Sequence, residues 1–171
     1  MSDPATTTAD LIGRRVKVLL VEDDPVCQMH YGAILAKEYN VDKATNVAEG
    51  IAKLNDPDIE GVVLDLGLPN GQGLEVIERF QAARPGIPIL VVTNYDFSAS
   101  DVIQRGAQDI LRKTYMSPQD MLSSLRRAIA RHLVRGVLKP IREAAQAVSK
   151  GLEKIEQKAR EREEKSPLPS E

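Results

Sequence analysis

The feature that most constrains the fold is a repeated change of hydrophobic period along the chain. Three short runs, at residues 16–21, 61–65 and 87–93, are nearly continuous in apolar residues and rich in valine, isoleucine and leucine. Runs of this kind are typical of strands that are covered on both faces of a sheet. Between them lie longer segments with the apolar spacing of an amphipathic helix. The alternation predicts parallel strands joined by helical crossovers.

Capping residues mark where the helices begin. Asp24 followed by Pro25 predicts a helix over 26–38, and Asn46 with Glu49 has the spacing of a capping box before a helix over 47–55. The remaining elements are predicted as a weak strand at 41–45, a helix with the stripe Leu74, Ile77 and Phe80, a helix at 98–105, a strand at 108–112 and a helix from Ser117-Pro118 to about Arg135. We therefore expect an α/β fold over residues 14–135: a flavodoxin-like, doubly wound parallel sheet of five strands with five helices.

The composition removes several classes of function. The formal net charge is −2, from 23 Lys+Arg against 25 Asp+Glu, which is not the balance of a polycation built for nucleic acid or lipid. The single cysteine, Cys27, excludes an internal disulfide framework and fits a reducing, cytoplasmic location. No apolar run approaches the ~20 residues of a membrane helix, so we expect no membrane partner. Residues 1–13 are predicted as a flexible tail and residues 166–171 as a disordered one.

Charged and hydroxyl side chains stand where the predicted strands end. Glu22 and Asp23 follow the first strand, Asp65 closes the third, Thr93 the fourth, and Lys113 follows the fifth. Because ligands of open parallel sheets bind beyond the carboxyl ends of the strands, we expect these side chains to share one pocket. Two carboxylates ~4 Å apart repel by about 4 kcal/mol at an effective dielectric constant near 20, so the cluster calls for a cation. Mg²⁺, which prefers oxygen ligands, would balance the three acids together with Lys113.

Four segments together resemble the receiver domain of bacterial two-component response regulators. They are Val18-Leu-Leu-Val-Glu-Asp-Asp24, Val63-Leu-Asp-Leu-Gly-Leu-Pro69 with Gly71 and Gly73, Leu90-Val-Val-Thr93, and Gly106-Ala107 ahead of Lys113. The resemblance covers residues 14–135, which is most of the chain.

This resemblance implies a role for each residue of the pocket. Asp65 would attack a phosphohistidine on a sensor histidine kinase or phosphotransfer protein and become an aspartyl phosphate. Glu22, Asp23, Asp65 and the carbonyl group of Gly67 would hold Mg²⁺, and Lys113 and Thr93 would contact the phosphoryl oxygens. The phosphorylated form would signal to a downstream protein by a shift between two packings. Such a protein is no enzyme beyond catalysing its own phosphorylation and dephosphorylation.

Three positions depart from the family pattern. Thr114 follows the lysine where the family has proline, Ile110 stands where it has a switch aromatic, and Asn94 follows Thr93 where it prefers a very small residue. We predict that phosphorylation is retained with altered kinetics. The departures also keep open a phosphorylation-independent receiver-like scaffold or dimerisation module. A haloacid-dehalogenase-like phosphatase would need an aspartate two residues after Asp65, where Gly67 stands.

A second pattern occupies residues 136–165, which we predict as an amphipathic helical extension. Its apolar residues, starting just before it, keep a strict three-four spacing: Val134, Leu138, Ile141, Ala145, Val148, Leu152, Ile155 and Ala159. A period of 3.5 predicts a coiled coil that makes a homodimer, with Lys158 and Glu163 placed to attract across a parallel pair. The alternative is a helix folded back onto its own domain. Gly151 weakens the helix, and Pro140 is expected to kink or interrupt it.

A basic stretch precedes and enters this extension. Its cations are Arg112, Lys113, Arg126, Arg127, Arg131, Arg135, Lys139 and Arg142, against Asp120 alone. A basic helix face is usually solvated or docks on an acidic protein, and no helix-turn-helix follows it. We therefore expect no direct binding to nucleic acid.

Overall fold

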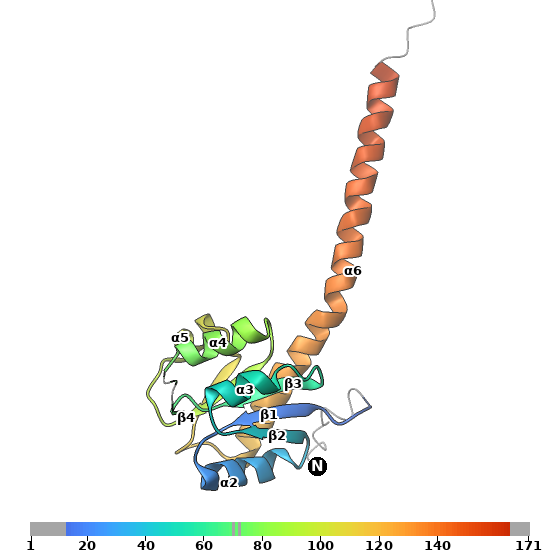
Figure 1. The fold of residues 1–171 in the computed structure, drawn as a ribbon. Helices are drawn as coiled ribbons and strands as arrows, with labels where there is room; N and C mark the ends of the chain where they lie inside the picture. The colour runs from blue at the N-terminus through green and yellow to red at the C-terminus, as the bar shows by residue number, and fades with distance from the viewer. Residues whose placement is uncertain (1–12, 70, 72, 165–171) are drawn as a thin grey trace, which may run out of the picture. The chain divides into compact units, whose positions relative to one another are not determined.

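The computed structural model describes residues 13–69, 71 and 73–164, and these contain a parallel sheet of five strands (Figure 1). In chain order the strands are β1 (Lys17–Val21), β2 (Asn40–Ala44), β3 (Ile59–Leu64), β4 (Ile89–Thr93) and β5 (Asp109–Arg112). Across the sheet their order is β2-β1-β3-β4-β5, and every neighbouring pair is parallel. The structure confirms the predicted flavodoxin-like topology.

Helices connect each strand to the next. They are α2 (Pro25–Leu35), α3 (Val47–Lys53), α4 (Glu75–Ala83), α5 (Ala99–Gln104) and, after β5, α6 (Pro118–Glu164). Figure 1 shows α2 on one side of the sheet and α3 and α4 on the other. Both faces of the central strands are thereby covered, which explains why β1, β3 and β4 carry nearly continuous apolar sequence.

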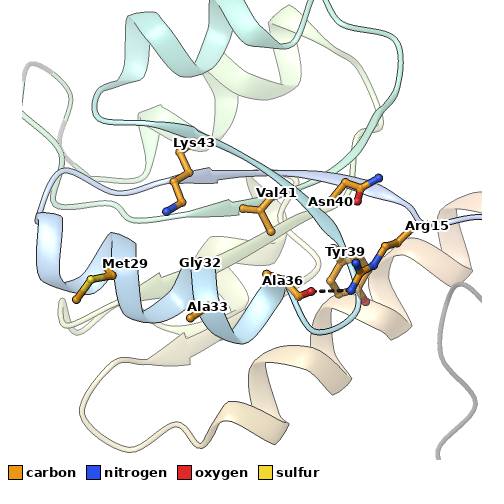
Figure 2. A pocket seen from close by; sticks show the side chains of 9 residues that line it. All are labelled: Arg15, Met29, Gly32, Ala33, Ala36, Tyr39, Asn40, Val41 and Lys43. Atoms are coloured by element: carbon orange, nitrogen blue, oxygen red, sulfur yellow. Dashed lines mark hydrogen bonds between the residues drawn. The ribbon is translucent and has the colours of Figure 1, made fainter.

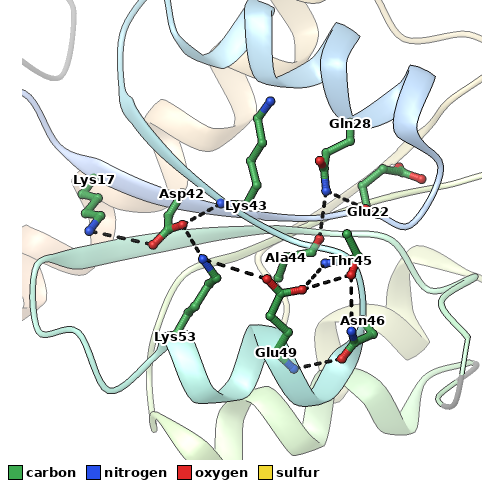
Figure 3. Close-up of polar contacts among 10 residues, drawn as sticks. All are labelled: Lys17, Glu22, Gln28, Asp42, Lys43, Ala44, Thr45, Asn46, Glu49 and Lys53. Atoms are coloured by element: carbon green, nitrogen blue, oxygen red, sulfur yellow. Dashed lines mark hydrogen bonds and ion pairs between the residues drawn. The ribbon is translucent and has the colours of Figure 1, made fainter.

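Helix starts follow the capping residues. The Asp24 carboxylate accepts a hydrogen bond from the N–H of Cys27 at 2.7 Å, and the Asn46 side chain accepts one from the N–H of Glu49 at 2.9 Å. Figure 3 shows one difference from the expected capping box: the Glu49 carboxylate accepts from the backbone N–H and hydroxyl of Thr45, at 2.8 and 3.0 Å. The reciprocal bond therefore holds the residue before the cap, which ties the end of β2 to the start of α3.

The first part of α6 packs closely on β3 because Gly61 has no side chain. A Cβ atom built on Gly61 would lie 3.1 Å from Ile129 Cδ1 and 3.5 Å from Leu125 Cδ1. Both of those side chains are fully buried. Arg126, between them on the helix, forms a two-pronged ion pair with Glu38, at 2.6 and 3.3 Å. This contact joins α6 to the turn before β2.

Helix α6 continues without interruption past the predicted break at Pro140. Of the two outcomes expected at Pro140, a kink or an interruption, the interruption does not occur. A proline inside a helix removes one backbone hydrogen bond, and the helix-forming residues on both sides keep the remaining ones. The chain divides into two compact units, one ending at His132 and the other beginning at Leu133, and α6 passes through this boundary. Among the residues that the structure describes, no helix is long and apolar enough to cross a membrane.

Candidate functional site

The five side chains predicted to form a pocket come from the carboxyl ends of four neighbouring strands. Glu22 and Asp23 directly follow β1, Asp65 follows β3, Thr93 ends β4 and Lys113 follows β5. These strands are adjacent in the sheet, in the order β1-β3-β4-β5. Parallel pairing puts all their carboxyl ends at one edge, so residues far apart in the chain are brought together there.

The three acids form one cluster. One carboxylate oxygen from each of Glu22, Asp23 and Asp65 lies within 4.8 Å of the other two. Glu22 and Asp65 are buried, with 2% and 7% of their surface exposed, whereas Asp23 is exposed. Two carboxylates are thus held inside the pocket and the third faces solvent at its mouth.

Lys113 bridges the two buried acids. Its ammonium Nζ lies 2.7 Å from Glu22 Oε2 and 2.7 Å from Asp65 Oδ2. Burial lowers the pKa of Lys113, but its hydrogen bonds to Asp65 and Glu22 outweigh that effect and the pKa is raised overall. Burial raises the pKa of Glu22, and the hydrogen bond from Lys113 opposes this. Lys113 is therefore a permanent positive charge within the pocket.

The donor set suits a hard divalent cation. Three carboxylates against one ammonium group leave the pocket with an excess of negative charge, concentrated within a few ångströms. Oxygen ligands of this kind, with one or two carboxylates binding directly, are those that Mg²⁺ prefers. Asp24, the fourth acid of the segment, is used differently: it caps α2, and its hydrogen bond from the N–H of Cys27 lowers its pKa.

Asp65 is held in place by its neighbours. Its backbone N–H donates to the carbonyl of Val21 at 3.0 Å, and its Oδ1 accepts from the N–H of Gly67 at 3.0 Å. Since Oδ2 accepts from Lys113, both carboxylate oxygens have a donor. Gly67, whose carbonyl group was predicted to bind Mg²⁺, contacts Asp65 through its amide group.

Thr93 is fully buried at the end of β4. Its hydroxyl oxygen accepts a hydrogen bond from the N–H of Tyr95 at 3.3 Å, and its carbonyl accepts one from the N–H of Lys113 at 3.1 Å. The ends of β4 and β5 are therefore tied together beside the acid cluster.

Tyr95 is a pocket residue that the sequence pattern did not reveal. A Cβ atom on Gly67 would lie 3.1 Å from Tyr95 Cε2 and 3.4 Å from Asp65 Oδ2, so the aromatic ring occupies space that the glycine leaves free. The ring is half-exposed and also contacts Phe97, with centroids 6.0 Å apart. The one sequence signal was Gly67 itself, because a missing side chain often marks a close approach.

Two of the three unusual positions contact each other. The Thr114 hydroxyl donates to Asn94 Oδ1 at 3.1 Å. Close to these two residues in sequence, Arg112 forms an ion pair with Asp96. These contacts link the segment after β4 to the segment after β5. Ile110, the third unusual position, is partly buried and packs against the hydrophobic core.

Several residues of the basic stretch are paired within the receiver-like unit. Arg126 binds Glu38, Arg112 binds Asp96, and Arg127 lies 3.7 Å from Asp109. Their charges are therefore partly neutralised by neighbouring acids of the same chain.

A separate hollow of about 630 Å³ lies between α2 and β2 (Figure 2). Its lining residues are Arg15, Met29, Gly32, Ala33, Ala36, Tyr39, Asn40, Val41 and Lys43. The Arg15 guanidinium donates to the carbonyls of Ala36 and Lys37, at 2.6 and 2.9 Å, and so serves the end of α2. No residue of the acid pocket lines this hollow.

Comparison with known proteins identifies the family and the fold. A family model for the response regulator receiver domain matches residues 18–126. The chain is 37% identical over 131 residues to the acid tolerance regulatory protein ActR of Sinorhizobium medicae, which covers 72% of this chain and 67% of that protein. It is 30% identical over 122 residues to the probable transcriptional regulatory protein TcrX of Mycobacterium tuberculosis, covering 70% of this chain and only 52% of TcrX.

The structural comparison agrees. A crystal structure of a CheY-like response regulator receiver domain from Methanospirillum hungatei superposes with a TM-score of 0.65 at 25% identity, over 71% of this chain and 99% of that one. The family match spans most of the sheet and all the strand ends that form the acid pocket. The chain belongs to the response regulator receiver family.

Proposed function

We propose that this protein accepts a phosphoryl group on Asp65 from a sensor histidine kinase or phosphotransfer protein. The observation that carries the proposal is the meeting of Glu22, Asp23 and Asp65 within 4.8 Å beside the charged Lys113. Asp65 lies beside the exposed Asp23 and the partly buried Lys113, where a carboxylate can act as a nucleophile and its product can be stabilised.

The transfer is a displacement at phosphorus. A carboxylate oxygen of Asp65 forms the new P–O bond while the P–N bond of the phosphohistidine breaks, and the imidazole nitrogen keeps the bonding electron pair. Lys113 is assigned to the phosphoryl oxygens, and it must exchange part of its present contact with Asp65 for them. Thr93 is assigned to a second phosphoryl oxygen through its hydroxyl group, which now accepts from Tyr95.

Glu22, Asp23, Asp65 and the carbonyl group of Gly67 are the residues proposed to hold Mg²⁺. The ion would supply positive charge to the transferring phosphoryl group. The excess negative charge of the cluster supports this assignment. Asp23 is the exposed member of the cluster. An incoming ion would therefore meet Asp23 first and exchange one of its bound waters for this carboxylate.

The kinetics are proposed to differ from those of receivers with the usual residues. Asn94 is engaged with Thr114, and the ring of Tyr95 lies over Gly67. Any movement of this segment toward a phosphoryl group must break the Asn94–Thr114 hydrogen bond and the Asp96–Arg112 pair. The same contacts favour the second candidate, a receiver-like scaffold that works without phosphorylation, because they hold the segment in one arrangement.

Mass spectrometry after incubation with acetyl phosphate or phosphoramidate and Mg²⁺ separates these candidates. We expect a gain of ~80 Da on the wild-type protein, which is lost with Asp65→Asn and without Mg²⁺. Asp58→Asn is the matched control, since Asp58 is an exposed aspartate just before β3. An unmodified wild-type protein would overturn the phosphoacceptor proposal in favour of the scaffold, and an adduct on Asp65→Asn would overturn the choice of residue.

We also propose that residues 14–135 form the receiver domain and that residues 136–165 form a helix that joins two copies. The protein would act in the cytoplasm, with output through contact with a downstream protein. Support for the homodimer comes from the exposed apolar stripe of α6, in which Leu138, Ile141, Val148, Leu152 and Ile155 are each 48% exposed or more. Exposed apolar area of this regularity is typical of an association surface.

A substitution in the stripe tests the homodimer. Leu152→Lys should convert the protein to a monomer by light scattering, because it places a charge in the apolar seam. Gln157→Lys, on the same helix but outside the stripe, should leave the mass unchanged. A wild-type protein that is already monomeric would contradict the homodimer and leave the phosphoacceptor proposal standing.

A further inference from the structure

The flanks of the apolar stripe on α6 differ in character. When the stripe residues are assigned to heptad positions a (Leu138, Ala145, Leu152, Ala159) and d (Val134, Ile141, Val148, Ile155), the g flank carries Val137, Ala144, Gly151 and Lys158, whereas the e flank carries Arg135, Arg142, Ser149 and Glu156. The g flank is therefore small and apolar until Lys158, whereas the e flank is polar, with its basic residues before its acidic one. All of these residues are exposed except Gly151, which is partly buried.

We propose that two copies of this helix pair in antiparallel orientation. The inference rests on the homodimer of the proposed function and specifies its geometry. In a parallel pair, each g residue faces an e residue five positions later on the other helix. Val137 would then face Arg142, and Gly151 would face Glu156, so that apolar and charged flanks are mixed. In an antiparallel pair, g faces g and e faces e, which keeps the polar e flanks together.

Charge complementarity supports the antiparallel pairing. With the twofold axis near residue 150, Arg142 of each copy faces Glu156 of the other, and the two Ser149 side chains lie close together. Within the described part of the chain, neither Arg142 nor Glu156 forms an ion pair, although Lys139 and Glu143 on the same helix do. Arg142 and Glu156 are 14 positions apart, about 21 Å along the helix, so they can meet only across two chains.

The sizes of the stripe residues agree with the same register. Ala145 faces Ile155 of the second copy, Ala159 faces Ile141, and Val148 faces Leu152. A large side chain therefore fills the space beside each alanine. A parallel pair would instead set Ala145 against Ala145 and Ala159 against Ala159, which leaves thin layers. It would also place β-branched residues at every apolar d position and leucine at a, a pattern that disfavours two-stranded parallel coils.

One charge pair favours the parallel arrangement. Lys158 and Glu163 would attract each other there, but the Glu163 side chain lies outside the described residues. The antiparallel arrangement pairs the apolar residues from Ile141 to Ala159 with one another, whereas Leu138 would face Arg162. Because each receiver precedes residue 133, antiparallel pairing attaches the two receivers to opposite ends of the paired helices.

Distances between spin labels test the orientation in the full chain. Cys27→Ser provides a cysteine-free background, and single labels are placed through Lys150→Cys or Glu161→Cys, both at exposed positions outside the stripe. In the antiparallel register, the labels at position 161 are offset by 22 residues, about 33 Å along the axis, and those at position 150 have no offset. We expect a much longer distance at 161 than at 150. Equal distances at both positions would overturn the proposal in favour of a parallel pair.

Charge reversal provides a second, independent test. Arg142→Glu and Glu156→Arg should each weaken the dimer about five-fold or more, because like charges then face each other twice in every dimer. The double variant should recover most of the wild-type affinity, measured by sedimentation equilibrium. Independent, additive losses would overturn the antiparallel pairing. A monomeric wild-type protein would overturn it together with the homodimer, whereas the phosphodonor experiment on Asp65 would be unaffected.

Discussion

Residues 118–132 and residues 133–164 belong to the same helix, but their apolar side chains have opposite environments. In the first part, Met121, Leu125 and Ile129 are fully buried. In the second part, Leu138, Ile141 and Leu152 are 48%, 61% and 56% exposed. Both parts have the apolar spacing of an amphipathic helix, so the pattern alone does not distinguish a helix packed in its own domain from one whose apolar face is exposed.

The difference arises from what lies opposite each part. The first part faces β3, where Gly61 leaves room for Leu125 and Ile129. The second part lies in a unit that contains no strand and no other helix among the residues that the structure describes. Within the single chain, its helical form therefore depends on local propensity.

The largest test of this comparison removes a leucine from each part. Leu125→Ala should lower the free energy of unfolding of the receiver by about 2–5 kcal/mol, because it leaves a cavity in a packed core. Leu138→Ala should change that quantity by less than about 0.5 kcal/mol. Urea unfolding followed by tyrosine fluorescence measures the receiver alone, because Tyr31, Tyr39, Tyr95 and Tyr115 all precede residue 133. Equal losses for the two variants would show that both parts belong to one core.

Prolines offer a smaller, more local comparison. Pro118 stands at the start of α6, where a missing N–H costs little, whereas Pro140 stands inside the helix. Pro140→Ala should stabilise the helix locally by about 3 kcal/mol, and Pro118→Ala should have a far smaller effect. Amide hydrogen exchange of residues 134–146 measures this, with slower exchange expected for Pro140→Ala only. Unchanged exchange would mean that another contact already supports the helix at Pro140.

The smallest expected effect is a loss of folding stability at low pH, caused by Asp120 at the start of α6. Hydrogen bonds from the backbone N–H and the hydroxyl of Ser117 lower the pKa of Asp120 below its ordinary value of 3.8. The folded protein therefore binds this proton less tightly than the unfolded chain does. The resulting stability is present above the ordinary pKa and is lost as the pH falls through the lowered folded value.

Asp120→Asn measures this contribution. The variant should be less stable than the wild type at neutral pH, and the difference in urea midpoint should shrink as the pH falls toward roughly 3. A difference that stays constant with pH would show that the charge of Asp120 does not stabilise the helix start.

Much of the fold was predictable because its signals are local. Asp24, Asn46 and Ser117 each accept a hydrogen bond from the backbone N–H three residues ahead, as their positions predicted. Strand and helix boundaries differ modestly from prediction; α2 ends at Leu35 and not at residue 38. The continuity of α6 through Pro140 was not predicted. The free-energy cost of one proline does not show whether the neighbouring turns of the helix remain hydrogen-bonded.

The residues of the pocket also divide into those that the sequence predicted and those that it did not. Glu22, Asp23, Asp65, Thr93 and Lys113 could be named because a residue at the end of a parallel strand has a known place in the sheet. The position of Tyr95 beside Gly67 and the bond between Asn94 and Thr114 could not be named, because loops of irregular backbone decide them.

By itself, the sequence determined the alternation of strands and helices, the acids at the strand ends and the heptad stripe, because each depends on near neighbours in the chain. Only the tertiary structure decided that Lys113 reaches both Glu22 and Asp65, and that Arg126 pairs with Glu38 across 88 positions. Such contacts depend on how separate elements pack, and the same charged side chains can take many partners until the packing of the sheet and helices selects one.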